Sequence, residues 1–154
     1  MLRHKRKIGP GPYINRASRL IMRLGDMRLR PLGVAAGQVP VFAMLADGVQ
    51  LTQKTLAETA QIEQPSMAQL LARMERDRLV ERLPNPADKR SSLLKLTKLA
   101  EEKVPEIMKT LQRGGQQMLA GFTPEERDSL IHLLGRVVEN LETAVAEELS
   151  ANEE

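Results

Sequence analysis

The sequence has no cysteine, no tryptophan, one tyrosine and two phenylalanines among its 154 residues. Without cysteine, the chain can form no disulfide, no thiolate metal site and no thiol redox switch. Its only histidines, His4 and His132, are widely separated, which argues against a histidine metal site. Because aromatic residues are so scarce, aliphatic side chains and the eight methionines must fill the core. We therefore expect no metal and no cofactor.

Long apolar runs are also missing. No stretch approaches the roughly 18 apolar residues that span a bilayer, and no apolar segment follows the basic residues 3–7 as it would in a signal peptide. There is no glycine-rich phosphate loop and no nucleophile signature. The sequence thus predicts a cytoplasmic chain of one domain, with no membrane partner and no enzymatic activity.

Positive charge is concentrated in the front part of the chain. Residues 1–98 contain 18 Lys and Arg against 8 Asp and Glu, a balance of +10, whereas residues 99–154 contain 5 against 12, a balance of −7. A basic front part beside an acidic tail indicates contact with a polyanion such as nucleic acid. A solvated surface with uneven charge would give the same counts, so charge alone does not decide between the two.

The N-terminal part is expected to consist of an arm and two helices. Residues 1–12 are basic and then rich in Gly and Pro, which is typical of a flexible arm. Residues 13–35 contain an amphipathic helix over 13–30, because apolar residues recur there every three or four positions before a Pro and a Gly. A second helix is expected over 36–46.

Two short helices joined by a tight turn follow. Thr52 is a good N-cap for the first, because its hydroxyl can accept a hydrogen bond from a free amide of the first turn. The second, over 64–77, has Pro65 in its first turn and a narrow apolar stripe. Such a pair is typical of a helix-turn-helix, although many helical hairpins share the pattern.

A β-hairpin is predicted directly behind this pair. Residues 79–83 and 91–96 have the composition of strands, and the segment 84–90 has that of a polar turn with a basic tip. A basic hairpin behind a helix-turn-helix describes a winged helix. The expected fold is therefore mainly α with a small β-hairpin wing, and the winged helix-turn-helix lobe spans residues 36–97.

Residues 98–150 are expected to form two more helices. The first is capped by Thr97 and runs to about residue 119, with a kink at Pro105. Thr123 is followed by a Pro and two Glu, which predicts a capping box at the start of the last helix. That helix is expected to run to about residue 149.

The first helix and the C-terminal helices carry apolar stripes wider than one winged-helix unit can cover. They could pack into a bundle within one chain, but we favour pairing with a second copy. In a twofold dimer the two copies of the 64–77 helix, which we call the reading helix, would lie about one DNA turn apart, roughly 34 Å. Such a dimer would match a pseudo-palindromic DNA site. The residues assigned to this homodimer interface are Ile14, Leu20, Ile21, Leu130, Leu134, Val137, Leu141 and Val145.

Residues 29–100 resemble the MarR family of bacterial transcriptional regulators. The matching segments are Leu29–Val34, Thr55–Glu58, Leu79–Arg82, Pro84–Arg90 and Leu94–Thr97. The fourth segment contains the family's Asp-x-Arg wing signature, placed between a Leu-Val-Glu-Arg strand and a Leu-Thr helix start. The flanking helices agree with the family in order and length, so the resemblance covers most of the chain.

The resemblance implies a triangular homodimer with two winged-helix lobes that binds double-stranded DNA in a promoter, most often as a repressor. It also implies release by a small, commonly aromatic, ligand bound between the dimer helices and the DNA-reading lobe. Candidate residues lining that pocket are Tyr13, Arg16, Phe42 and Met44. Two alternatives stay open: a helical dimeric interaction protein that has lost DNA binding, and an architectural protein that coats DNA without a defined operator.

Candidate DNA contacts come from the paired helices and the wing. Glutamine can pair with both major-groove groups of adenine and arginine can fork onto guanine, so the candidates on the 64–77 helix are expected to read bases. Thr52 and the two lysines are candidates for phosphate, and Arg90 for the minor groove. Asp88 is acidic and is expected to support the wing by holding an arginine side chain or the turn. The residues assigned to DNA are Thr52, Lys54, Gln64, Ser66, Gln69, Arg73, Lys89 and Arg90.

Three residues depart from the family pattern. Arg78 stands where the family usually has Gly after the reading helix, so it must adopt a positive φ or the turn must differ, at a cost on the order of 1 kcal/mol. Ala68 and Gln69 stand where hydroxyl and basic residues are common. These two changes bear on the preferred DNA sequence more than on the fold.

Overall fold

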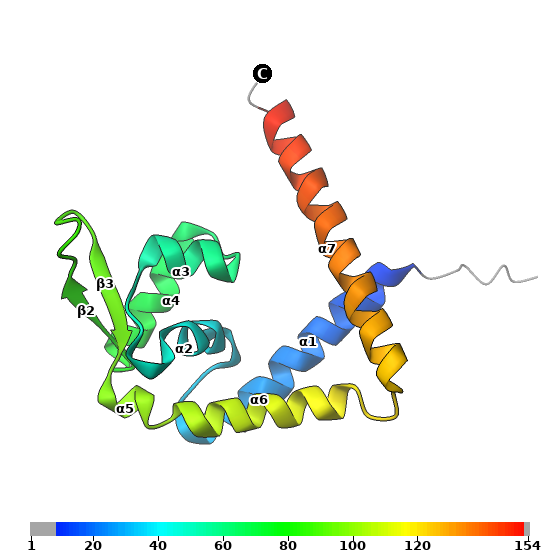
Figure 1. The fold of residues 1–154 in the computed structure, drawn as a ribbon, viewed down its shortest axis with the longest axis horizontal. Helices are drawn as coiled ribbons and strands as arrows, with labels where there is room; N and C mark the ends of the chain where they lie inside the picture. Colours follow the sequence, from blue (N-terminus) through cyan, green and yellow to red (C-terminus); the bar gives the residue numbers. More distant parts are fainter. Residues whose placement is uncertain (1–8, 153–154) are drawn as a thin grey trace, which may run out of the picture. The chain divides into compact units, whose positions relative to one another are not determined.

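The chain divides into two units, Met1–Gly114 and Gly115–Glu154. The structure is a computed structural model that describes residues 9–152 (Figure 1); the predicted arm residues 1–8 lie outside this range. The α-helices are α1 Pro10–Leu29, α2 Val39–Leu45, α3 Gln53–Ala60, α4 Gln64–Arg76, α5 Lys98–Glu101, α6 Val104–Met118 and α7 Pro124–Ala151. The strands are β1 Leu51–Thr52, β2 Val80–Pro84 and β3 Ser92–Leu96, and the short 3-10 helices are η1 Arg30–Leu32, η2 Ala36–Gln38 and η3 Ala46–Gly48.

Helix α1 begins at Pro10, three residues before the predicted start. The expectation of a flexible arm is therefore wrong for residues 10–12. Proline suits the first helical position because it lacks the N–H that would be unpaired there anyway, and because its fixed φ is already helical. Pro10 and Pro12 thus lie in the first turn of the helix and not in a flexible arm.

The end of α1 is held by close packing against η2. A Cβ added at Gly25 would lie 2.9 Å from the Cβ of Ala36, so only glycine allows this approach. The Asp26 carboxylate also accepts a 2.7 Å hydrogen bond from the backbone N–H of Ala36. These contacts set the direction in which the chain enters α2.

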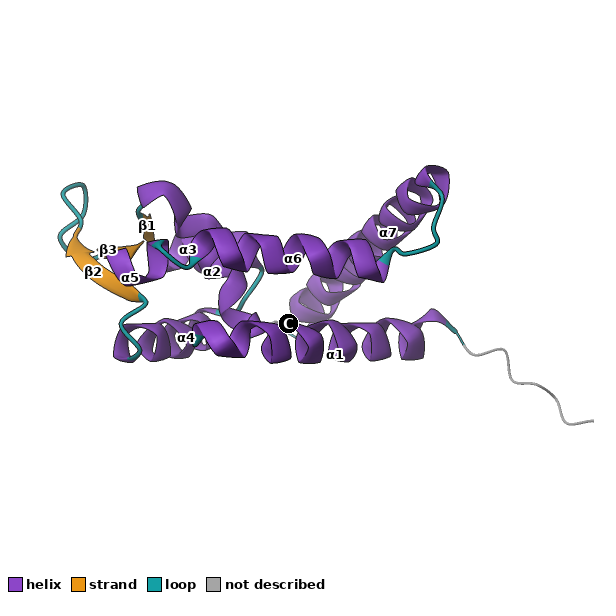
Figure 2. Ribbon diagram, turned by 90° about the horizontal axis from the view of Figure 1, so that it is seen from below, coloured by secondary structure: helices purple, strands orange, loops and turns teal. Residues whose placement is uncertain are grey.

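The sheet contains a third strand that the sequence did not predict. β1 pairs with β3 and β3 with β2, all antiparallel, in the order β1-β3-β2 (Figure 2). β1 is only two residues long, Leu51 opposite Leu94 and Thr52 opposite Leu93, which is too short for an alternating pattern to be recognised. Thr52 is nevertheless the N-cap of α3, as predicted, because its Oγ1 accepts from the N–H of Thr55.

The core of the first unit lies between the sheet and α2, α3 and α4. β2 and β3 pair from Val80 opposite Leu96 to Pro84 opposite Ser92, and this confirms the predicted hairpin. Alternation along β3 turns Leu94 and Leu96 inward. The largest fully buried side chains are Phe42, Leu29, Leu45, Leu56, Met67, Leu71, Met74, Leu94, Ile107 and Val41.

Arg78 adopts a φ of 58°, as required if the turn after α4 keeps the left-handed form usually made by Gly. The backbone N–H of Leu79 donates to the carbonyl of Met74 at 2.8 Å, which closes the helix end. The carbonyl of Arg78 accepts a 2.7 Å hydrogen bond from the Thr97 hydroxyl. The surrounding contacts therefore hold a non-glycine residue in a strained conformation.

Arg78→Gly is expected to raise the free energy of unfolding by about 0.5–1 kcal/mol, because relief of left-handed strain outweighs the entropy that glycine adds to the unfolded chain. Urea titration followed by circular dichroism measures the change. Ala72→Gly, in the right-handed part of α4, is the control and should cost about 1 kcal/mol. An equal loss in both variants would contradict the strain at Arg78.

The helix expected from Thr97 to about residue 119 is two helices, so the predicted kink at Pro105 is a full break. Proline has no N–H to donate to the carbonyl of Glu101 and its ring would clash there, so it is accommodated in the first turn of α6 instead. Within the break, Lys103 Nζ donates to the carbonyl oxygen of Leu32 at 2.7 Å. This bond joins the start of α6 to the end of η1.

The second unit contains the long helix α7 and the capping box predicted for its start. The Thr123 hydroxyl accepts from the N–H of Glu126, and the Glu126 carboxylate accepts from the N–H of Thr123. The pKa of Glu125 is lowered, because its own backbone N–H and then the Thr123 hydroxyl donate to its carboxylate. Local signals alone therefore place the start of this helix.

Within residues 9–152, no group of three or more His, Asp or Glu side chains is placed to hold a metal ion. No single helix in this range is both long enough and apolar enough to cross a membrane. The segments Pro10–Leu32 and Ala36–Gly48 meet the criteria of length and composition only as a pair, and they are bent by 88° to each other.

Candidate nucleic-acid interface

Helix α4 buries one face and exposes the other. Its buried residues are Met67, Leu70, Leu71 and Met74, the predicted apolar stripe. The four predicted base-reading residues, Gln64, Ser66, Gln69 and Arg73, are all exposed. The core therefore fixes the helix while polar side chains of varied hydrogen-bonding capacity face outward.

One side chain that could orient Gln64 was missed by sequence reasoning. Gln53, the first residue of α3, is half-buried, and its Nε2 donates to Gln64 Oε1 at 3.4 Å. The two glutamines are eleven residues apart, so no local pattern predicts the contact. The tight turn between the helices places them together, with Gln61 in the left-handed conformation at φ 55°.

Thr52, the N-cap of α3, and Lys54 on α3 are candidate phosphate contacts that differ in the interactions they already make. Thr52 Oγ1 accepts from the backbone of Thr55 and lies 3.0 Å from its hydroxyl, so its main role in the free chain is helix capping. Lys54 lies 3.8 Å from Glu58, but both side chains are largely exposed and such a pair is weak. Lys54 is therefore free to turn toward a phosphate.

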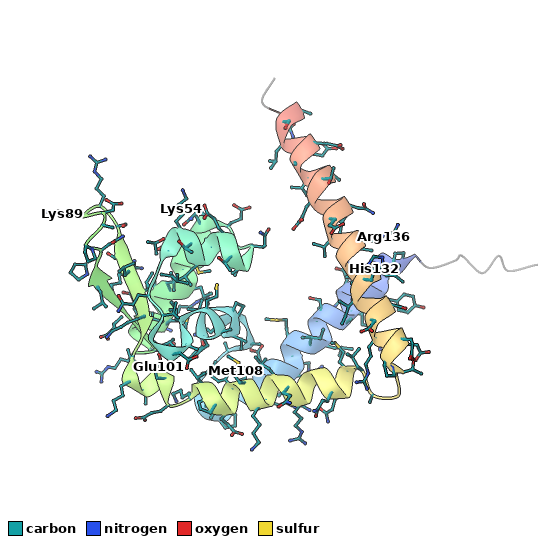
Figure 3. The ribbon with its side chains drawn as sticks, viewed as in Figure 1. Lys54, Lys89, Glu101, Met108, His132 and Arg136 are labelled. Carbon is teal, nitrogen blue, oxygen red and sulfur yellow. The ribbon has the colours of Figure 1, made fainter. Side chains whose placement is uncertain are left out.

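The wing presents its positive charge to solvent. Lys89 and Arg90 are exposed, and neither side chain forms an ion pair within residues 9–152. Figure 3 shows Lys89 at the tip of the hairpin and Lys54 on α3 projecting to the same side of the lobe, whereas Glu101 lies at the other end. Two of the candidate phosphate contacts, Lys54 and Lys89, thus share one side.

Among the residues that the structure describes, Asp88 holds the backbone of the turn and no arginine side chain. Its Oδ1 accepts from the N–H of Arg90 at 2.9 Å, two residues on, which is the geometry of an Asx turn. We expect this carboxylate to hold either an arginine side chain or the turn, and in the structure it holds the turn. The Asp88 carboxylate is therefore hydrogen-bonded within the turn and forms no ion pair with the Arg90 guanidinium.

An ion pair joins the wing to the reading helix. Arg82 Nε donates to Glu75 Oε1 at 2.9 Å, from β2 to α4, and both side chains are only about one-third exposed. Lys95 and Glu81 form a second pair, also at 2.9 Å, between β3 and β2. Neither pair was predicted, because each depends on how strands and helix pack.

The residues assigned to a ligand pocket do not line the open groove of the first unit. Phe42 is fully buried in the core, Met44 packs against the core, and Tyr13 is 66% exposed on α1. The first unit has an open groove of about 840 Å³ beside α1, and none of the four predicted residues lines it. The groove is lined by Ser18, Arg19, Met22, Arg23, Asp26, Met27, Arg30, Gly33, Val34, Ala35, Gln38 and Asp77.

The apolar residues assigned to a homodimer interface are uncovered in the single chain. On α1, Ile14, Leu20 and Ile21 are exposed, and on α7 Leu134, Leu141 and Val145 are exposed, while Leu130 and Val137 are half-buried. Each helix by itself therefore presents an apolar stripe that a partner could bury.

Comparison with known proteins points to one family. A sequence model of the MarR family matches residues 32–91. The chain is 32% identical over 120 residues to a Bacillus subtilis protein described as the uncharacterized HTH-type transcriptional regulator YwoH, covering 78% of this chain and 87% of that protein.

Solved structures agree with this match. A mutant of E. coli MarR in complex with operator DNA has a TM-score of 0.78 at 27% identity, over 89% of this chain and 99% of that one. The S. aureus MepR–DNA complex has a TM-score of 0.81 at 19% identity, over 87% and 99% of the two chains. This second likeness concerns the fold alone.

Proposed function

Because the chain belongs to the MarR family and is a DNA-binding transcriptional regulator, we propose that it binds a pseudo-palindromic duplex site as a homodimer. Each α4 enters a major groove, and each wing reaches the adjacent minor groove with Arg90. We further propose that the protein works in the cytoplasm, by binding and not by catalysis, and represses transcription until a small ligand releases it.

The observation that supports this most is the pairing of a free cationic wing tip with an exposed polar helix face in one lobe. Arg82 and Glu75 join these two elements at 2.9 Å. In our proposal Gln64, Ser66, Gln69 and Arg73 contact base edges, and Thr52, Lys54 and Lys89 contact phosphates. Base contacts then set sequence preference, while phosphate contacts set affinity and its dependence on salt.

The exposed apolar stripes of α1 and α7 support the homodimer. Covering them with a second copy would remove a large apolar area from water at about 25 cal/mol per Å². In a twofold dimer the two copies of the reading helix would lie about 34 Å apart, which is one turn of B-DNA. One lobe alone offers too few contacts for a specific site of that length.

The groove beside α1 is our candidate for the site of the releasing ligand. Arg19, Arg23 and Arg30 contribute positive charge, and Met22, Met27 and Val34 contribute apolar surface. This combination suits an anion with an apolar body. Asp77, which ends α4, also lines the groove, so a ligand there would lie next to the end of the reading helix.

The experiment that tests the proposal is selection of bound duplexes from a random pool, repeated with aromatic carboxylic acids present. We expect enrichment of a two-fold-symmetric sequence with half-sites about one turn apart, and loss of binding with an effective acid. Equal affinity for all sequences would instead favour an architectural role. No duplex binding at low salt would favour a helical interaction protein.

Lys89→Ala is expected to lower the slope of log affinity against log salt by about one unit, without changing which bases are preferred. The reason is that one fewer phosphate would release its counterion. Titrations of the selected duplex between low and high salt measure the slope. Lys109→Ala, on α6 where the lysine pairs with Glu106, is the matched control. An unchanged slope for Lys89→Ala counts against the phosphate contact.

A further inference from the structure

The wing tip is a closed network in which residues outside the Asp-x-Arg signature take part. Asn85 Oδ1 accepts from the N–H of Ala87 at 3.0 Å, and Asn85 Nδ2 donates to Ser91 Oγ at 2.8 Å. Ser91 Oγ in turn donates to the carbonyl oxygen of Asp88 at 3.2 Å. The two ends of the loop are thus joined to each other and to its middle.

This network lies beneath the exposed tip. Asn85 and Ser91 are half-buried, whereas the residues from 86 to 90 are exposed. The last strand pair, Pro84 opposite Ser92, lies just below, so the Asn85–Ser91 bond continues the hairpin by one step. A polar bond that is partly shielded from water contributes more than one at the tip would.

The bonds hold the backbone and leave the cationic side chains free. Asp88, Asn85 and Ser91 satisfy backbone groups or one another, while Lys89 and Arg90 form no ion pair within residues 9–152. Fixing the backbone of a free loop costs roughly 1–2 kcal/mol per residue. A loop that is already fixed avoids that loss when it binds.

We propose that Asn85 and Ser91 are positioning residues for Arg90, and that their side-chain bond aims its guanidinium at the minor groove. The inference rests on the proposed function, in which Arg90 enters that groove. It adds that the aim depends on a bond across the loop as well as on the Asx turn of Asp88. Removing that bond should therefore reduce affinity only while Arg90 is present.

The test is a double-mutant cycle on the selected duplex, with affinity measured by fluorescence anisotropy. Ser91→Ala is expected to weaken binding about 3- to 10-fold, since it removes the bonds to Asn85 and to the Asp88 carbonyl. Asn85→Ala also removes two bonds, to Ser91 and to Ala87, and should weaken binding to a similar extent. Ser91→Thr keeps the hydroxyl and should restore affinity to within about twofold of the parent.

The matched control is Ser92→Ala, the same change one residue along, where the hydroxyl forms no side-chain hydrogen bond within residues 9–152. It should leave affinity unchanged. In the Arg90→Ala background, Ser91→Ala should cost less than about twofold, because there is no guanidinium left to aim. The same loss in both backgrounds would overturn the positioning role.

Three other outcomes also decide whether the positioning role holds. If Arg90→Ala weakens binding but neither Ser91→Ala nor Asn85→Ala does, the loop needs no such bond and the inference is wrong. If the parent itself shows no preferred duplex, the proposed function is wrong, and the positioning role that rests on it is wrong as well. A loss in only one of the two variants would also overturn it, because the same bond is removed from either side.

Discussion

Alanine in place of Arg90 is expected to weaken binding of the preferred duplex about 5- to 150-fold, the equivalent of about 1–3 kcal/mol. The Arg90 side chain is exposed, and the backbone N–H of Arg90 donates to Asp88 Oδ1 at 2.9 Å. A narrow minor groove concentrates negative potential, which favours an inserted arginine. Fluorescence anisotropy with a labelled duplex at fixed salt measures the loss.

Arg90→Lys separates charge from shape. Lysine keeps the positive charge but is more strongly hydrated and lacks the planar fork. It should keep the salt dependence of the parent while losing the preference for A·T pairs where the wing reaches the groove. Sedimentation should show the same oligomeric state for the parent and both variants, since the residues assigned to the dimer interface are on α1 and α7 and none is in the wing. Equal affinity of parent and alanine variant would contradict the minor-groove role.

Phe42→Ala is expected to lower the free energy of unfolding by about 3–5 kcal/mol. Phe42 is fully buried on α2, and the chain has only two phenylalanines and no tryptophan. Few other side chains can fill the space, so a cavity would remain. Because domains of this size are stable by only about 5–15 kcal/mol, the variant should lose a large part of its stability in urea.

The second phenylalanine supplies the matched control. Phe122 is 39% exposed and lies in the other unit. Phe122→Ala should therefore cost about 1 kcal/mol or less in the same titration. Similar losses for the two variants would mean that Phe42 is not the anchor of the core that its burial indicates.

Features that depend on near neighbours in the sequence were predicted well. Thr52 and Thr123 are N-caps, because a cap needs only a hydroxyl and an amide within three residues. The β2–β3 hairpin follows from two apolar runs around a turn. Of the two alternatives for Arg78, a positive φ or a different turn, the structure has the positive φ. The assignment of individual residues to DNA remains a prediction.

Errors arose where one local signal had two interpretations. Pro10 and its neighbours were interpreted as loop, although proline also suits a first turn, and α1 begins there. Pro105 was expected to bend a helix, but it lies in the first turn of a new one, α6. The ligand pocket assigned to Tyr13, Arg16, Phe42 and Met44 stays a prediction; a residue type does not reveal whether a side chain lies in the core, as Phe42 does.

The sequence by itself determined where most helices and strands lie, which faces are apolar and where charge gathers, since hydrogen bonds and periodicities within a few residues decide these. Only the tertiary structure decided which distant side chains meet. The Arg82–Glu75 pair, the Gln53–Gln64 contact and the pairing of β1 with β3 join segments separated by seven to more than forty residues. Such contacts follow from how whole elements pack, and packing depends on the summed shape and burial of all of them.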